Sequence, residues 1–409
     1  MKKEIVITGI GIYSPIGKNT HEVYESIINS ESGIQLIDEI EVSQLRNNKG
    51  GVIKNIEETE TLNGFRSNIL LKHAAEEAVN SSRVNEIPLE DRNRIGVSIG
   101  TSVGGYGAFI DHMYKEHNSG STHALSLNPH SRIQNNGDII RNIPFSLLSL
   151  QIAKEYKFTG FISSSITACS ASANAIIMGA DMIKSGRIDI AVVGGVDPIS
   201  QLTLLGFNSL MAMTKSDLKP MDEKRSGLLI GEGAACLIIE EKEHALKRGV
   251  PILATLSGCG VTNDAFHSTR PHPDATGAIL AINHALEDAS LSPLDIDYIN
   301  LHGTGTKHND LMELNALKAI WGDNIEVPIS SSKSMMGHTL GAAGAIEAVI
   351  SVISLYHNIL PPNLNVTETI KGFKYNIVHK ARQGVKLNHV LSNSFGFGGN
   401  CASLVLSHY

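Results

Sequence analysis

The sequence predicts an α/β protein built from two similar halves. The chain has 409 residues, of which 42% are hydrophobic and 18% charged, so it is long enough for a large core. Its predicted strands are apolar on both faces and alternate with helices, which is typical of a parallel sheet covered on both sides. This alternation occurs twice, and the division near residue 255 gives an N-terminal half of residues 1–255 and a C-terminal half of residues 256–409.

Apolar runs bounded by glycine or polar residues predict the strands, and apolar residues at helical spacing predict the helices. After a first strand that opens residues 4–17, the expected strands are 94–100, 161–166, 189–197, 231–240, 252–260, 296–301, 327–331, 389–392 and 401–407. The expected helices are 20–30, 70–81, 144–156, 171–182, 275–289 and 342–357. We expect residues 31–65 to form an irregular surface segment, residues 119–142 a long loop or lid, and residues 215–225 a charged loop.

Charge and cysteine content argue against several classes of protein. The formal net charge of −7 gives no general attraction to nucleic acid. The four cysteines are far apart and lack the spacing of a zinc site or a disulfide framework, which favours a reduced, cytosolic protein. We expect no secretory signal and no membrane span, because the most apolar run, residues 342–356, is short and contains Glu347. Gly9-x-Gly11 lacks the remaining features of a dinucleotide site, so we expect no such site there.

Cys169 lies where an apolar segment, residues 161–166, meets the helix expected at residues 171–182. At this strand-to-helix turn the helix N-terminus faces the sulfur, which lowers the pKa of a thiol. A nucleophilic cysteine is one interpretation, and a small buried hydrophobic residue is the other. The turn by itself favours neither.

Three further segments place polar chemistry at the end of an apolar element. His302 follows the strand expected at residues 296–301 and begins a Gly/Thr turn, a position where α/β enzymes present ligand-facing groups. Lys333 and His338 lie in the next such segment, and the glycine-rich residues 392–400 allow backbone amides to approach a ligand. Glu347 lies within the apolar helix, where a carboxylate needs a cationic partner, and Lys333 is the nearest in sequence.

These segments together resemble the β-ketoacyl-acyl-carrier-protein synthases, above all synthase II and the ketosynthase subunits of type II polyketide systems. The runs that carry the resemblance are Thr167-Ala-Cys-Ser-Ala, His302-Gly-Thr-Gly-Thr, Lys333-Ser-Met-Met-Gly-His-Thr-Leu-Gly-Ala-Ala-Gly and Asn393-Ser-Phe-Gly-Phe-Gly-Gly. They occur in the family's order and cover essentially the whole chain. The resemblance implies a thiolase-like fold, in which two α/β halves form five layers (α-β-α-β-α), and a dimer.

The resemblance also implies an acyltransferase reaction, a decarboxylative Claisen condensation that yields 3-oxoacyl-acyl-carrier protein and carbon dioxide. Cys169 would hold the acyl group, and His302 and His338 would donate hydrogen bonds to the enolate of malonyl-carrier protein. The backbone amides of Cys169 and Phe397 would form the oxyanion hole, with Phe397 also acting as a gate. Lys333, paired with Glu347, would order the pocket.

Further roles follow only from the resemblance. Acyl groups would arrive on the phosphopantetheine of acyl carrier protein, with no other cofactor and no catalytic metal. The partners would be this carrier and a second subunit, in a homodimer or a ketosynthase/chain-length-factor heterodimer, with no nucleic acid or membrane. Thr304 and Thr306 would bind the pantetheine arm, and Phe109, Ile110 and Phe207 would line the acyl pocket. A structural monovalent cation would lie at Asn300, Glu347, Ser392 and Asn393, and the candidates for carrier docking are Arg66, Lys72 and Lys215.

The chain departs from the family's usual residues in the Ser-Ala-Ser-Ala-Asn174 run after Cys169, at Lys307 in place of proline, and at Met211 in place of a basic residue. Two alternative functions remain. One is a chain-length-shaping partner subunit with little activity of its own, which the complete Cys169, His302, His338 and Lys333 set disfavours. The other is a thiolase or acyl-CoA acyltransferase, which would need a second catalytic cysteine such as Cys401.

Overall fold

The computed structural model describes residues 3–38, 40–56, 65–118 and 143–409. The expected lid at residues 119–142 lies outside the described residues. Eleven of the described strands form one sheet in the order β12-β10-β9-β14-β15-β8-β1-β7-β6-β4-β5. In chain order these strands are β1 (Ile5–Tyr13), β4 (Ile95–Gly100), β5 (Ile162–Ser165), β6 (Ile190–Asp197), β7 (Gly233–Glu241), β8 (Ala254–Asn263), β9 (Tyr298–Asn300), β10 (Asn324–Ser330), β12 (Lys374–Ile377), β14 (His389–Gly396) and β15 (Asn400–Ser407).

The same series of strand pairings occurs twice in this sheet. β1 pairs antiparallel with β7, β7 pairs antiparallel with β6, and β6, β4 and β5 follow in parallel. In the second series β8 pairs antiparallel with β15, β15 with β14, and β14, β9 and β10 follow in parallel. Antiparallel pairing of β1 with β8 joins the two series, so the sheet is continuous. A boundary at residue 255, which lies inside β8, stays a prediction.

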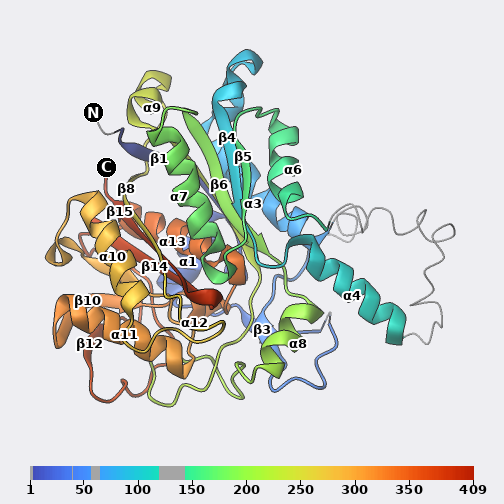
Figure 1. The fold of residues 1–409 in the computed structure, drawn as a ribbon, viewed down its shortest axis with the longest axis vertical. Helices are drawn as coiled ribbons and strands as arrows, with labels where there is room; N and C mark the ends of the chain where they lie inside the picture. The colour runs from blue at the N-terminus through green and yellow to red at the C-terminus, as the bar shows by residue number, and fades with distance from the viewer. Residues whose placement is uncertain (1–2, 39, 57–64, 119–142) are drawn as a thin grey trace.

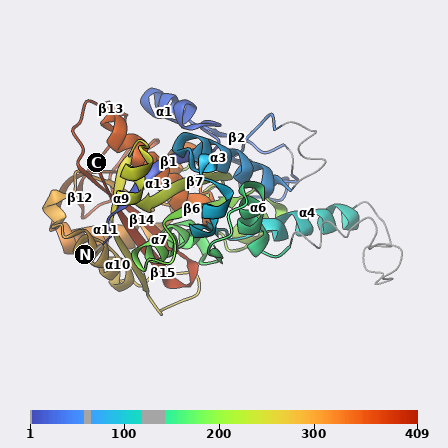
Figure 2. The ribbon, with the colours of Figure 1, turned by 90° about the horizontal axis from the view of Figure 1, so that it is seen from above.

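Helices cover both faces of the sheet. The longer helices are α1 (Thr20–Asn29), α3 (Arg66–Ser82), α4 (Gly104–Asn118), α6 (Ser146–Tyr156), α7 (Ala171–Lys184), α8 (Gln201–Ser209), α10 (Thr276–Ala289), α11 (Lys307–Trp321) and α13 (Ala343–His357). Helix α3 packs on β1 and β7, α10 packs on β8 and β15, and α7 and α13 pack against each other between the two series of strands (Figure 1). This is the five-layer α/β arrangement that was expected. Helix α4 extends outward from the body in both views (Figures 1 and 2).

Gly9 and Gly11 serve close packing of helix on strand. A Cβ atom at Gly9 would lie 2.3 Å from the carbonyl oxygen of Ala78, and one at Gly11 would lie 2.1 Å from that of Ala74. Both alanines belong to α3, so the glycines let this helix approach β1. The Gly-x-Gly pair is therefore explained without a nucleotide.

Helix α13 is a core element. Residues Leu340–His357 are long and apolar enough to cross a membrane by length and composition, but 89% of this stretch is buried inside the protein. Its apolar residues belong to the central hydrophobic cluster together with residues of α7 and β7. The helix therefore positions Glu347 in the interior, where that side chain is 1% exposed.

Several elements differ from the sequence-based expectations. Residues 31–65 are not wholly irregular, because β2 (Ile34–Leu36) pairs with β3 (Lys49–Gly51) and Ile37, Val52 and Ile53 are buried. These strands have three residues each, too few to show a strand period. Helix α3 begins at Arg66, four residues earlier than expected, and α4, α8, the short α9 (Lys242–Arg248) and α11 were not predicted. The charged loop at residues 215–225 is confirmed.

Candidate active site

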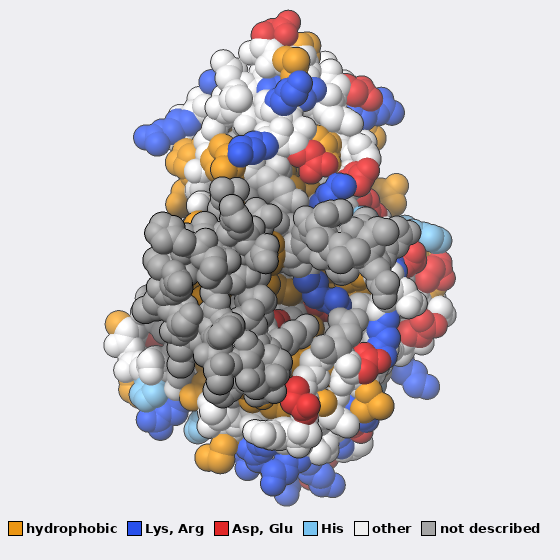
Figure 3. Space-filling view, turned by 90° about the vertical axis from the view of Figure 1, so that its right-hand side faces the viewer, with side chains coloured by type: hydrophobic (Ala, Val, Ile, Leu, Met, Phe, Trp, Pro, Cys, Tyr) orange, Lys and Arg blue, Asp and Glu red, His pale blue; other side chains and the backbone are white. Residues whose placement is uncertain are grey.

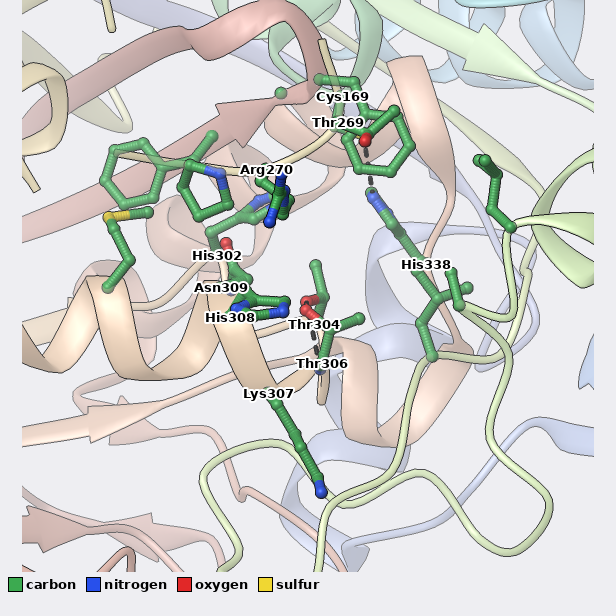
Figure 4. A pocket seen from close by; sticks show the side chains of 18 of the residues that line it. Cys169, Thr269, Arg270, His302, Thr304, Thr306, Lys307, His308, Asn309 and His338 are labelled. Atoms are coloured by element: carbon green, nitrogen blue, oxygen red, sulfur yellow. Dashed lines mark hydrogen bonds between the residues drawn. The ribbon is translucent and has the colours of Figure 1, made fainter. Parts of the chain in front are cut away.

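A cavity of about 440 Å³ brings together residues from both halves of the chain. Cys169, His302 and His338 line it (Figure 4), together with Phe207 and Phe397. The three segments that the sequence singled out with Cys169 therefore do meet it. The sulfur of Cys169, one imidazole nitrogen of His302 and one of His338 lie within 4.8 Å of one another.

Cys169 lies in the tight turn between β5 and α7. The turn is a single 3₁₀ turn, Ala168–Ser170, and Ala168 has a φ of 51°, in the left-handed region that a residue with a Cβ rarely adopts. Cys169 is 6% exposed. The chain reverses sharply here, so the sulfur faces the cavity while the N-terminus of α7 begins two residues later.

The expected lowering of the Cys169 pKa is wrong for the resting protein. Burial raises the pKa of the Cys169 thiol to about 11, although the charge of Lys333 and a hydrogen bond from the backbone N–H of Phe397 act in the opposite direction. The sequence placed the sulfur at a helix N-terminus correctly but could not show how completely it is buried. The resting side chain of Cys169 is therefore a thiol, and its deprotonation depends on the groups around it.

His338 is positioned as a hydrogen-bond donor to that sulfur. Its Nε2 atom lies 3.0 Å from Cys169 Sγ, and the backbone N–H of Leu340 donates to its Nδ1 atom at 3.3 Å. Burial, together with the charge of Lys333, lowers the pKa of His338 well below 6.5, so the imidazole is neutral. Because Nδ1 accepts a hydrogen bond, we assign the single ring proton to Nε2, which faces the cavity.

Lys333 fixes which nitrogen of the second imidazole, that of His302, carries the proton. The Nζ atom of Lys333 lies 3.4 Å from His302 Nδ1 and also contacts Glu347 Oε1. An ammonium group only donates, so His302 accepts at Nδ1 and carries its proton on Nε2. Burial and the Lys333 charge lower the pKa of His302 well below 6.5. The two rings are perpendicular at an interplanar angle of 84°, with centroids 5.4 Å apart.

Two residues that the sequence reasoning missed hold the segments that carry these groups. The side-chain carboxyl oxygens of Glu313, on α11, accept hydrogen bonds from the backbone N–H groups of His302 and Gly303, both at 2.8 Å. Asp197, at the end of β6, accepts from the N–H groups of Val103 and Gly341. Glu313 and Asp197 are both 0% exposed. An acidic residue at a strand end was the available signal for Asp197, whereas α11 itself was not predicted.

Phe397 closes one side of the cavity. Its ring stacks on Phe207 with centroids 5.6 Å apart, and its backbone N–H donates to the sulfur of Cys169. The geometry therefore suits Phe397 to both roles that the resemblance implies, donor and gate.

Thr304 and Thr306 line the cavity, and their hydroxyl oxygens lie 2.9 Å apart. Arg270 also lines it, whereas the side chain of Lys307 extends away from the Cys169 and His338 pair (Figure 4). Phe109 and Ile110, on α4, are not among the residues that line this cavity. Their place in an acyl pocket stays a prediction.

The residues of the predicted cation site lie around the buried end of β9. Asn300 pairs with Ser392 across the sheet and donates to the carbonyl oxygen of Glu347. Among the described residues, Asn300 Oδ1 and Glu347 Oε2 are buried without a hydrogen-bond partner. Buried oxygens without a partner are costly, so the cation site at these residues stays a prediction. Asn393 follows Ser392 in β14, so its side chain points to the opposite face and bonds Ser403 instead.

Cys401 also lines the cavity, which is the feature a thiolase interpretation needs. Its sulfur contacts the carbonyl oxygen of Gly399 at 3.5 Å, and burial raises its pKa to about 12. No imidazole is found within hydrogen-bond distance of it in the described part of the chain. Cys401 therefore lacks the activating contacts that Cys169 has.

The fold repeats one series of strand pairings and arranges strands and helices in five layers. A cysteine at a strand–helix turn faces two imidazoles in it. Thiolase-fold condensing enzymes have this arrangement. Residues 2–245 match the family model described as the N-terminal domain of beta-ketoacyl synthase, and residues 253–367 match that of its C-terminal domain. The chain therefore belongs to the β-ketoacyl synthase family. Membership makes it an acyltransferase of the β-ketoacyl-acyl-carrier-protein synthase class.

Individual relatives agree with the family assignment. The 3-oxoacyl-acyl-carrier-protein synthase 2 of Coxiella burnetii is 33% identical and is matched over 99% of both chains. Two solved structures match over 100% of both chains. One is the ishigamide ketosynthase/chain length factor, with 30% identity and a TM-score of 0.91. The other is a type II polyketide acyl-carrier protein in complex with its ketosynthase, with 26% identity and a TM-score of 0.90.

Proposed function

We propose that the chain catalyses decarboxylative condensation of an acyl group on Cys169 with malonyl-acyl-carrier protein, in fatty-acid or type II polyketide or polyene biosynthesis. The observation that carries the proposal is the contact between His338 Nε2 and Cys169 Sγ, 3.0 Å long, in a cavity that His302 also lines. This arrangement supplies a nucleophile and two neutral N–H donors at one place.

In the first half-reaction, the sulfur of Cys169 attacks the thioester carbonyl of the acyl-carrier protein. A carbon–sulfur bond to Cys169 forms, the one to the pantetheine breaks, and the thiol proton passes to the leaving thiolate. The carbonyl oxygen becomes an oxyanion in between, and the backbone N–H groups of Cys169 and Phe397 stabilise it. A nearby N–H donor and the Lys333 charge favour the attacking thiolate.

In the second half-reaction, malonyl-carrier protein loses carbon dioxide and the electrons of the broken bond form an enolate. The Nε2–H groups of His302 and His338 donate to the enolate oxygen, because both rings are neutral and carry their protons there. The enolate carbon attacks the acyl carbonyl, the bond to sulfur breaks, and Cys169 takes up one proton from solvent. The product is a 3-oxoacyl-carrier protein, two carbons longer.

The test is to compare Cys169→Ala and Cys169→Gln with the unchanged chain, using an acyl-carrier protein and malonyl-carrier protein. Both variants lose condensation, and Cys169→Gln keeps malonyl decarboxylation, since the two imidazoles remain. Condensation by the Cys169→Ala variant would overturn the proposal.

Carrier docking is best supported at the rim of the cavity near Met211. Among the three docking candidates, Arg66 is occupied, because its guanidinium is ion-paired with the buried Glu232. Lys215 is exposed and shares a cleft with Arg46 and Lys49, and Arg46 donates to the carbonyl oxygen of Met211, a residue that lines the active-site cavity. Although the chain is acidic overall, Figure 3 shows basic side chains gathered at the lower edge of one face.

We infer that Arg46 and Lys215 attract an acidic acyl-carrier protein to this rim. Lys215→Glu then raises the KM for acyl-carrier protein at least threefold with kcat unchanged, more strongly at low salt. Lys247→Glu, on the short α9, is the matched control and leaves KM unchanged. Lys72, exposed on α3, stays a candidate; a KM that moves with Lys72→Glu and not with Lys215→Glu would contradict this surface.

A second subunit is best supported at β5, which with β12 is one of the two edge strands of the sheet within the described residues. Ile162 in β5, Ile166 just after it and Met178 on the adjacent α7 are 41%, 52% and 43% exposed, and exposed apolar side chains beside a sheet edge favour another chain. We propose a second ketosynthase-like chain as the occupant. Ile166→Glu then lowers the mass of the native assembly to that of one chain; an unchanged mass would place the interface elsewhere.

The remaining proposals follow from the family. Acyl groups reach Cys169 on the phosphopantetheine of acyl carrier protein, and the chain works in the cytoplasm. The monovalent cation at Asn300 and Glu347, with Ser392 beside them, orders the buried carboxylate. Anomalous scattering from crystals grown with rubidium tests this site, and no peak beside Asn300 Oδ1 would refute it.

A further inference from the structure

The Asn174 side chain ties together the two sides of the turn that carries Cys169. Its Nδ2 group donates to Thr167 Oγ1 at 2.8 Å, and to the carbonyl oxygen and the hydroxyl oxygen of Ser170, both at 3.2 Å. Ser170 Oγ in turn donates to the carbonyl oxygen of Thr167 at 2.9 Å. Thr167 precedes Cys169 and Ser170 follows it, so the network spans the nucleophile without touching its sulfur.

The turn needs such support because its backbone is unusual. Ala168 has a φ of 51°, which an isolated alanine avoids. Residues held in such regions persist only where the surrounding structure fixes them. One side of the turn is fixed by β14, since a Cβ atom at Gly396 would lie 2.9 Å from Thr167 O and 3.1 Å from Cys169 N. Asn174, one helical turn after Ser170, fixes the other side.

A purely stabilising role for Asn174 is the simpler alternative. An asparagine in the first turn of a helix bonds nearby backbone and hydroxyl groups in many proteins. In this chain, however, its shortest bond goes to a side chain outside α7, on the far side of the nucleophile. Loss of that bond therefore affects the turn around Cys169 more than it affects helix α7.

We infer that Asn174 is a positioning residue, which holds the Cys169 turn so that the sulfur and the Cys169 N–H keep their places relative to Phe397 and His338. Its effect on catalysis rests on the proposed function. Because displacement of a reacting group by about 1 Å can cost about 100-fold in rate, a loosened turn lowers the rate of acyl transfer and leaves carrier binding unaffected.

The test compares Asn174→Ala with Asn80→Ala, an exposed asparagine near the end of α3 that serves as the control. We expect Asn174→Ala to lower kcat for acylation of Cys169 by about 10- to 100-fold with KM for acyl-carrier protein unchanged. Asn174→Gln, which keeps the amide donors, recovers part of the rate. An unchanged kcat in folded Asn174→Ala, or a loss explained by a lower melting temperature, would overturn the inference.

A double-mutant cycle with Thr167→Val separates positioning from general stability. Thr167→Val removes the other end of the same bond, so Asn174→Ala has little further effect in that background. Should Asn174→Ala fail to fold, Thr167→Val carries the test alone, with the same fall in kcat expected. Full additivity would contradict the inference. Alkylation of Cys169 by iodoacetamide reports on the geometry of the turn without requiring acyl transfer. If the chain accepts no acyl group, the proposed function is refuted, but the role of Asn174 can still be tested by the alkylation rate.

Discussion

The Nε2 atom of His338 lies 3.0 Å from the sulfur of Cys169, although 169 residues separate them in the chain. The bond from Leu340 N–H to Nδ1 assigns the ring proton to Nε2, so the imidazole presents an N–H donor to the sulfur. The same logic applies to His302, whose Nδ1 atom faces Lys333. The site is therefore organised to stabilise negative charge on oxygen and sulfur.

Loss of this donor lowers the rate of condensation. We expect His338→Ala to reduce kcat by about 100- to 1000-fold, the cost of removing one oxyanion donor, with KM for malonyl-carrier protein changed little. His21→Ala, an exposed histidine on α1, is the control. Steady-state kinetics with both carriers check this, and a His338→Ala enzyme with normal kcat would contradict the donor role.

The pH dependence of decarboxylation tests the neutrality of both imidazoles. The pKa values of His302 and His338 are lowered well below 6.5 by burial, so neither ring gains a proton between pH 6 and pH 7.5, a range chosen for the assay. We expect malonyl decarboxylation by the Cys169→Gln variant to be constant over that range. An inflection near the usual histidine pKa would show that one ring is protonated there.

The reactivity of Cys169 follows its raised pKa. With a pKa of about 11, about 10⁻⁴ of the resting protein is thiolate at pH 7, so alkylation of Cys169 rises about tenfold per pH unit between about pH 7 and 9. Lys333→Ala slows alkylation further, because the Lys333 charge lowers this pKa; Lys247→Ala is the control. Peptide mass spectrometry after iodoacetamide gives the rates, and a plateau near pH 7 would mean that the helix N-terminus outweighs burial.

Glu313 makes stability depend on pH. Burial raises the pKa of its carboxyl to about 8 from 4.5, so between these values the folded protein keeps a proton that the unfolded chain has lost. Rising pH therefore destabilises the folded state through this group, by at most about 1.4 kcal/mol per pH unit. In Glu313→Gln the unfolding free energy falls less steeply with pH, because this one proton no longer distinguishes the folded from the unfolded chain. Urea unfolding at several pH values checks this, and identical slopes for both proteins would contradict it.

The sequence was sufficient for the fold class and for the residues that meet at the cavity. Cys169, His302 and His338 each follow an apolar strand or precede a buried helix, and parallel strands bring such ends to one edge of a sheet. Their roles remain proposals, but their convergence does not depend on the resemblance.

Three features could not be predicted from the sequence. The degree of burial of Cys169 depends on the packing of both halves, so the direction of its pKa shift was predicted wrongly. Helix α11 was missed because Asp310 and Glu313 are buried in it, which breaks the apolar period on which the prediction relied. The occupation of Arg66 could not be predicted either, because nothing in the sequence pairs it with Glu232, 166 residues away.

The most direct test of the account is the intact mass of the chain after incubation with a mixture of acyl-carrier proteins. We predict one acyl adduct, located at Cys169 by peptide mapping, which disappears when malonyl-carrier protein is added and a 3-oxoacyl-carrier protein forms. The Cys169→Ala variant gains no adduct. An adduct at Cys401, or a chain that carries no acyl group while condensation proceeds, would contradict the account.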